Sequence, residues 1–317
     1  SSDIMSNRGD DTIRLLGGIN SSAVKGGEQN DTIYLEGTTT SASVFGGSGN
    51  DSITYNDADS DITSTLFQDG TGNNNFSITS QSFVGSSVVA GSGADTISVT
   101  STNAISKSSI QGADGNDRLT ATADYEDSTI AGGVGNDSVT VVGAVQRSSI
   151  YGGSGNDTIT ATVAGNELDD VLIKDSSGNN KITVTATTTL DTLTINGGSG
   201  QDEITLTAAT EDTYITGGGE DDSVTVTGAL DTSTIYLGVG DDVVDLNGAV
   251  SDVLIQSGSG TNSYDIAGNT SATVNGGSGS DSLLVTGTLD GAFTMGEGKD
   301  TVEVNGANLA KGTLKMG

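Results

Sequence analysis

Hydrophobic and polar residues alternate along this chain in short runs that return about every 20 residues. Each return contains a glycine-rich phrase ending in Asp or Asn, which we call the marker, as in Gly46-Gly47-Ser48-Gly49-Asn50-Asp51. The fifteen markers are Asp11, Asp31, Asp51, Asn74, Asp95, Asp117, Asp137, Asp157, Asn180, Asp202, Asp222, Asp242, Asn262, Asp281 and Asp300. Their spacing averages about 20.6 residues, a period typical of solenoids, in which each coil buries its apolar face only against neighbouring coils.

Three apolar columns keep a fixed distance from the marker. In the third copy they are Ile53, two residues after the marker, Tyr55, four residues after it, and Val44, seven residues before it. The spacing of two predicts a β-strand after the marker with these side chains pointing inward, and Val44 belongs to a second strand before the glycines. We therefore expect an all-β fold, a single elongated parallel β-solenoid like a β-roll. It would have about fifteen coils of about 20 residues with two strands per coil.

The length of the repeat varies on one side only. The step from the column before the glycines to the marker is always seven residues, so the glycine edge has a fixed length and the opposite edge does not. We expect residues 1–317 to form one continuous solenoid that is cut within a repeat at both ends. Three copies, those ending in Asn74, Asn180 and Asn262, resemble one another more than they resemble their neighbours.

The amino-acid composition excludes several classes of function. The chain has 11 Lys plus Arg against 42 Asp plus Glu, a formal charge of −31, so it repels nucleic acid and anionic lipid surfaces and attracts cations. It has no Cys and no His, which excludes disulfides, thiolate metal sites and the commonest general base. No apolar run approaches a membrane span, and we expect no membrane insertion. A β-helix enzyme such as a polysaccharide lyase would need a base and a basic grip on its substrate, so we expect no enzyme.

The candidate chemistry lies on the glycine edge. Glycines five, four and two residues before the marker allow φ > 0 and a close approach between coils. Stacking would align the marker carboxylates about every 4.8 Å, which is unfavourable unless a cation lies between them. Oxygen ligands in a flexible array suit Ca²⁺. The predicted metal ligands are Asp11, Asp31, Asp51, Asp95, Asp117, Asp137, Asp157, Asp202, Asp222, Asp242, Asp281 and Asp300. The alternative is that the glycines only form turns and that the Asp caps the following strand.

The phrase Gly-Gly-x-Gly-x-Asp-x-aliphatic-x resembles the RTX, or haemolysin-type, calcium-binding repeat. Five copies match all of its fixed positions, beginning at Gly46, Gly132, Gly152, Gly197 and Gly276. The resemblance implies a parallel β-roll that holds calcium between adjacent coils with Asp carboxylates and main-chain carbonyls. It also implies type I secretion and a place outside the bacterial cell. The family usually carries the phrase in both turns of a coil, whereas this chain carries it in one, so we expect one row of calcium.

Two functions fit these patterns. The first is a secreted, calcium-dependent structural protein of the bacterial cell surface, in a surface layer, a filament or an adhesin stalk. It would assemble with itself end to end or laterally and could contact cell-surface polysaccharide. The alternative is an ice- or carbohydrate-binding module that uses the Thr-rich outer strand face, which includes Thr120, Thr140 and Thr160 but breaks at Asp245. Under the first hypothesis, folding is coupled to the metal, because the acidic edge repels itself without a cation.

Overall fold

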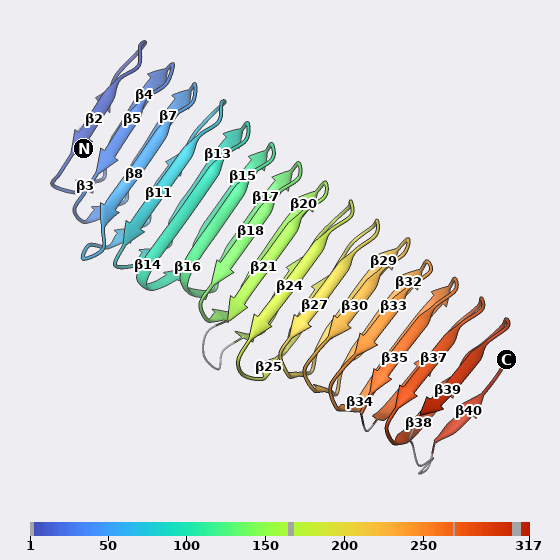
Figure 1. Ribbon diagram of the computed structural model, residues 1–317. Helices are drawn as coiled ribbons and strands as arrows, with labels where there is room; N and C mark the ends of the chain where they lie inside the picture. Colours follow the sequence, from blue (N-terminus) through green and yellow to red (C-terminus); the bar gives the residue numbers. More distant parts are fainter. Residues whose placement is uncertain (1–2, 164–167, 269, 306–311) are drawn as a thin grey trace. The chain divides into compact units, whose positions relative to one another are not determined.

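The computed structural model describes residues 3–163, 168–268, 270–305 and 312–317. The chain divides into two compact units, Ser1–Ile159 and Thr160–Gly317. Each unit is a parallel β-solenoid with two sheets, and the chain makes about 15 turns of roughly 20 residues, which confirms the predicted fold class (Figure 1). None of the described residues forms a helix that is long and apolar enough to cross a membrane.

In the first unit, the strands before the glycine turns form one sheet, the pre-turn sheet, and the strands after them form the other, the post-turn sheet. The pre-turn strands are β1 (Ile4–Met5), β4 (Ala23–Glu28), β7 (Ser43–Ser48), β10 (Leu66–Gln68), β13 (Ser87–Ser92), β15 (Ser109–Asp114), β17 (Thr129–Val134) and β20 (Ser149–Ser154). The post-turn strands are β2 (Thr12–Leu15), β5 (Thr32–Leu35), β8 (Ser52–Asp57), β11 (Asn75–Ser80), β14 (Thr96–Ser106), β16 (Arg118–Glu126) and β18 (Ser138–Val142). The unit boundary falls within β21 (Thr158–Val163).

The second unit repeats this plan. Its pre-turn strands are β23 (Val171–Lys174), β26 (Leu193–Asn196), β29 (Tyr214–Gly219), β32 (Thr234–Val239), β34 (Val250–Ser259), β36 (Thr270–Asn275), β38 (Leu289–Thr294) and β40 (Thr313–Lys315). Its post-turn strands are β24 (Lys181–Ala186), β27 (Glu203–Thr207), β30 (Ser223–Val226), β33 (Val243–Leu246), β35 (Ser263–Ala267), β37 (Ser282–Thr286) and β39 (Thr301–Asn305).

The parallel register places equivalent positions of successive coils over one another, and this builds the core. Val24 pairs with Val44, and Ile33 pairs with Ile53, one coil further along the chain. The three predicted columns are buried through the interior of each unit, while Ile4, in the first described coil, is 38% exposed. Each fully buried aliphatic side chain contributes about 1.5–3 kcal/mol, so burial between coils is the main source of stability.

Many of the described coils also contain a short strand that was not predicted from the sequence. These strands are β3 (Ile19–Asn20), β6 (Thr39–Thr40), β9 (Ile62–Thr63), β12 (Phe83–Val84), β19 (Val145–Gln146), β22 (Leu168–Asp169), β25 (Leu190–Asp191), β28 (Thr210–Glu211) and β31 (Leu230–Asp231). In several other coils, the same segment is part of a longer strand, as in β14 and β34. The short strands lie at the corner opposite the glycine turns, which we call the short-strand corner. They add a fourth buried column, which includes Ile62, Phe83 and Leu190.

The short-strand corner of the first unit is closed by a ladder of hydroxyl groups. The N–H of Ser86 donates to Oγ of Ser108 at 3.2 Å, and the N–H of Ser108 donates to Oγ of Ser128 at 3.0 Å. The Ser128 hydroxyl in turn donates to the carbonyl oxygen of Glu126 at 2.7 Å. These side chains occupy the small inward position nine residues before the marker, so each serine both accepts and donates a hydrogen bond inside the coil stack.

Candidate metal-binding ladder

The marker side chains are buried at the glycine corner, the segment from five residues before the marker to the marker itself. Asp31, Asp117 and Asp137 in the first unit and Asp222 and Asp242 in the second are each at most 3% exposed. The first and last markers, Asp11 and Asp300, are half-buried. Burial follows from the turn, which brings the chain back between the two sheets and points the marker inward.

One carboxylate oxygen of each marker closes the gap between two coils. The N–H of Asp31 donates to Oδ1 of Asp51 at 2.7 Å, and the N–H of Asp117 donates to Oδ1 of Asp137 at 2.7 Å. In the second unit, the N–H of Asp202 donates to Oδ1 of Asp222 at 2.9 Å. The glycine corner therefore contains a ladder in which every rung pairs a main-chain N–H with the side chain of the next coil, and this is the reason that its length is constant.

The other carboxylate oxygen has no partner. Oδ2 is buried without a hydrogen bond in Asp31, Asp51, Asp95, Asp117, Asp137, Asp202, Asp222, Asp242 and Asp281. Burial is the largest cause of the raised carboxyl pKa of Asp117, Asp137 and Asp222, and the charges of neighbouring markers add to it. The pKa of Asp117 rises to about 6, and those of Asp137 and Asp222 rise to about 7. The accepted N–H opposes these effects but does not cancel them.

The Asn markers reveal what this second oxygen faces. Nδ2 of Asn74 donates to the carbonyl oxygens of Gly72 at 3.2 Å and Ala90 at 3.3 Å, one in its own coil and one in the next. Nδ2 of Asn262 makes the equivalent contact with the carbonyl of Gly276 at 3.2 Å. Because Asp and Asn have the same shape, Oδ2 of an Asp marker lies where these carbonyls point. Facing carbonyl oxygens repel it unless a proton or a cation intervenes.

The glycines have two different roles, and one corrects the expectation from sequence. Gly47 and Gly49 have φ values of 127° and 131°, and a Cβ on either would collide with a carbonyl of the preceding coil. The first glycine of the phrase, such as Gly132, does not have this positive φ. It is required because the carboxylate of its own marker, Asp137, occupies the space that a Cβ would need. The glycine therefore forms a cradle for the carboxylate.

The predicted ligands lie in rows rather than clusters. The first unit aligns its predicted aspartates from Asp11 to Asp157, and the second aligns those from Asp202 to Asp300, with Asn74 and Asn262 interrupting the rows. Within the part of the chain that the structure describes, no three acidic side chains come together as a metal centre. A cation at a rung would therefore take one carboxylate oxygen and complete its shell with glycine-corner carbonyls and water. Such a set of oxygens fits Ca²⁺, which accepts roughly six to eight oxygen ligands.

Two buried aspartates were missed by the sequence analysis. Asp69 and Asp175 stand five residues before the Asn74 and Asn180 markers, in place of the first glycine, and they are 4% and 1% exposed. Oδ1 of Asp69 accepts the N–H groups of Gly47 and Gly70, both at 2.8 Å. The sequence does contain a signal for them. In these two coils the marker is Asn instead of Asp, and the first glycine of the phrase is replaced by Asp.

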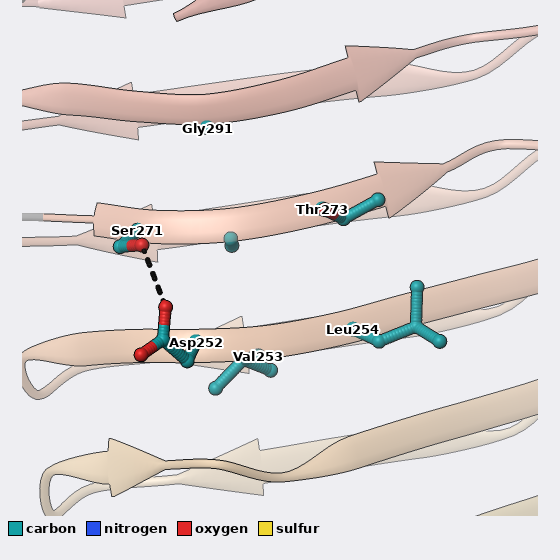
Figure 2. Close-up of a pocket in the computed structure, with 7 residues that line it drawn as sticks. Asp252, Val253, Leu254, Ser271, Thr273 and Gly291 are labelled. Atoms are coloured by element: carbon teal, nitrogen blue, oxygen red, sulfur yellow. Dashed lines mark hydrogen bonds between the residues drawn. The ribbon is translucent and has the colours of Figure 1, made fainter. Parts of the chain in front are cut away.

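The hollows on the surface of the second unit lie away from the ladder. One of about 400 Å³ is lined by residues of β34, β36 and β38, where Gly291 has no side chain to fill it (Figure 2). The Ser271 hydroxyl donates to Oδ1 of Asp252 at its edge, at 3.3 Å. It contains one carboxylate and no marker, so it adds nothing to the ladder.

The fold and the site together define a parallel β-solenoid with a ladder of buried aspartates along its glycine corner. Comparison with protein-family models, curated proteins and solved structures finds no match to this chain.

Proposed function

We propose that this chain is a calcium-binding structural solenoid of the bacterial cell surface. In this proposal, Ca²⁺ binds between successive glycine corners and stabilises both the fold and its assembly. The observation that supports it best is the second oxygen of buried Asp markers such as Asp137 and Asp222, which has no hydrogen-bond donor and is directed at main-chain carbonyls. A cation satisfies all of these oxygens at once, whereas an ionised carboxylate alone satisfies none of them.

A proton is the alternative partner for the second carboxyl oxygen, and the pKa values of the carboxyls give the pH range in which it would be bound. Carboxyls with a pKa of about 6 or 7, as in Asp117 and Asp137, lose their protons as the pH rises through about 6 to 7. The stacked charges then need another partner. A chain with a net charge of −31 in a calcium-rich medium outside the cell would find that partner in Ca²⁺.

The cellular context rests on the repeat phrase and on composition. The resemblance to RTX repeats supports secretion by a type I system, and the charge supports a role away from nucleic acid and anionic lipid. Self-association, end to end or lateral, suits a monotonous repeat whose coils already pair through their main chains. The absence of His and Cys from the sequence supports a structural protein rather than an enzyme.

Calcium titration of metal-stripped protein tests the proposal. At pH 8, far-ultraviolet circular dichroism should show a cooperative change from disordered chain to β-structure as Ca²⁺ is added, with no such change for K⁺. Electron microscopy of the same sample should show filaments or sheets only with Ca²⁺. A β-spectrum that ignores both Ca²⁺ and its removal would contradict the proposal and make the glycine corner a turn and nothing more.

A matched pair of variants assigns the effect to the ladder. Asp137→Asn should lose one equivalent of bound Ca²⁺ and still fold, because Asn74 shows that Asn fits this position. Asp59→Asn removes the same charge from an exposed turn and should bind as the unmodified chain does.

A further inference from the structure

The coil that ends in Asn74 carries its carboxylate in a different place from its neighbours. Its marker is neutral, and the aspartate stands five residues earlier, at Asp69. The Asn74 side chain completes the marker ladder without charge, because its Oδ1 accepts the N–H of Asp51 at 2.9 Å and its amide donates to two carbonyls. Asp69 is therefore not needed to continue the ladder.

Asp69 points into the space of the coil before it. In ordinary coils, the place above the first glycine is filled by that coil's own marker, as Asp31 fills it above Gly26. Above Gly46 it is the carboxylate of Asp69 that fills this place. The marker of that coil is Asp51, so the carboxyl groups of Asp51 and Asp69 converge over one glycine.

Both carboxylates present an unsatisfied oxygen at this point. Asp51 is 3% exposed and Asp69 is 4% exposed, and Oδ2 of each is buried without a hydrogen-bond partner. The Oδ1 atoms are already occupied by main-chain N–H groups, which fix the orientation of both side chains. Burial, followed by the charge and direct contact of Asp51, raises the pKa of Asp69 to about 8. Two such groups together are costly unless something positive lies between them.

A hollow in the surface adjoins one member of this pair. It has a volume of about 190 Å³ and is lined by Phe45, Gly47, Gln68, Asp69 and Gly70. Asp69 is thus the member of the pair that lies next to a space large enough to hold water or an ion. The rungs between ordinary coils present one carboxylate, whereas this place presents two, with main-chain carbonyls nearby.

We propose that Asp51 and Asp69 form a two-carboxylate site that binds one Ca²⁺ more tightly than any single-carboxylate rung of the ladder. The chemical reason is that Ca²⁺ affinity rises with the number of charged oxygens in a preformed site. This site goes beyond the proposed function, because two converging carboxylates can hold Ca²⁺ even where a rung with a single carboxylate does not.

Equilibrium dialysis with radioactive Ca²⁺ at pH 8 tests the site in the full chain. The unmodified protein should fill one tight equivalent first. Asp69→Asn should remove that equivalent or weaken it about tenfold or more. Asp59→Asn, with the same loss of charge on an exposed turn, should retain it. Equal tight binding by Asp69→Asn and the unmodified chain would overturn the site while leaving the ladder proposal intact.

A second pair of variants guards against a folding defect in Asp69→Asn. Asp51→Asn and Asp31→Asn both place Asn at a marker, where Asn74 shows that it fits, but only Asp51 faces a second carboxylate. Asp51→Asn should lose the tight equivalent, and Asp31→Asn should lose a weaker one and keep the tight one. If the two behave alike, the site is wrong. If one tight equivalent is the only Ca²⁺ bound, the site stands and the ladder proposal fails. If no Ca²⁺ binds at all, both fail.

Discussion

The two corners of each coil in the first unit solve the same problem with different groups. At both corners, a buried main-chain N–H donates to a side-chain oxygen of the next coil. At the short-strand corner, the N–H of Ser108 reaches Ser128 at 3.0 Å, and at the glycine corner that of Asp117 reaches Asp137 at 2.7 Å. The serine then donates its own proton to a carbonyl, so nothing is left unsatisfied. The ionised aspartate has no proton to donate, and its second oxygen has no hydrogen-bond partner.

This difference shows that the carboxylate is not needed for the stacking of coils. Serine at one corner and Asn74 at the other show that a neutral side chain is sufficient to join two coils. A carboxylate adds nothing to that joint except a buried negative charge, which is unfavourable in a low-dielectric interior. Its recurrence at the glycine corner is consistent with the proposed partner of opposite charge, and the three predictions that follow test this contrast between the corners.

The largest effect should come from pH, because the buried side chains that join the coils are carboxyls at the glycine corner and hydroxyls at the short-strand corner. The folded pKa values of about 6 for Asp202 and about 7 for Asp137 and Asp222 lie above the ordinary value of 3.8. The stability from their protonation is thus fully present below about pH 3.8 and is lost as the pH rises through 6 to 7. Metal-stripped protein should therefore have a measurable Tm at pH 5, and this Tm should fall as the pH rises until the chain is disordered at pH 8.

Saturating Ca²⁺ should reverse this trend, since protons then compete with the cation for the same oxygens. Thermal unfolding followed by circular dichroism between pH 5 and pH 8, with and without Ca²⁺, measures both curves. A metal-stripped protein whose Tm is constant or rises with pH would show that the marker carboxyls are not the groups that control stability.

Removing a hydrogen bond at the short-strand corner should have a smaller effect on stability, and this effect should not depend on Ca²⁺. Ser128→Ala leaves the buried N–H of Ser108 without an acceptor, which costs about 1–3 kcal/mol. Denaturant unfolding at pH 5, where the metal-stripped chain is expected to be folded, should show the same loss with and without Ca²⁺, because no charged group is involved. Ser77→Ala, at an outward position of β11, is the control and should change the free energy of unfolding little. A loss that appears only with Ca²⁺ would mean that the two corners are coupled.

Features that repeat with the 20-residue period could be predicted from the sequence. Features that depend on contacts between particular neighbouring coils could not. Three columns such as Ile53, Tyr55 and Val44 were predictable because strands alternate sides and parallel stacking repeats them. The short-strand column was missed because polar residues such as Thr39 interrupt it. The role of Asp69 could not be predicted, because the spacing of residues along the chain does not reveal that this side chain extends into the preceding coil.

The smallest predicted effect concerns the backbone conformation of the glycine corner. Ala113 stands four residues before its marker, where most other coils have glycine, and it has a φ of 86°. An alanine in this region is strained, so Ala113→Gly should stabilise the protein by about 1 kcal/mol. Ala131→Gly, in the strand β17, is the matched control and should destabilise it, because there glycine only adds freedom to the unfolded chain. The two Tm shifts should have opposite signs with and without Ca²⁺, since neither change touches a carboxylate. If both variants lose stability, the backbone at Ala113 does not adopt the left-handed form, and the close approach between coils at this corner has another origin.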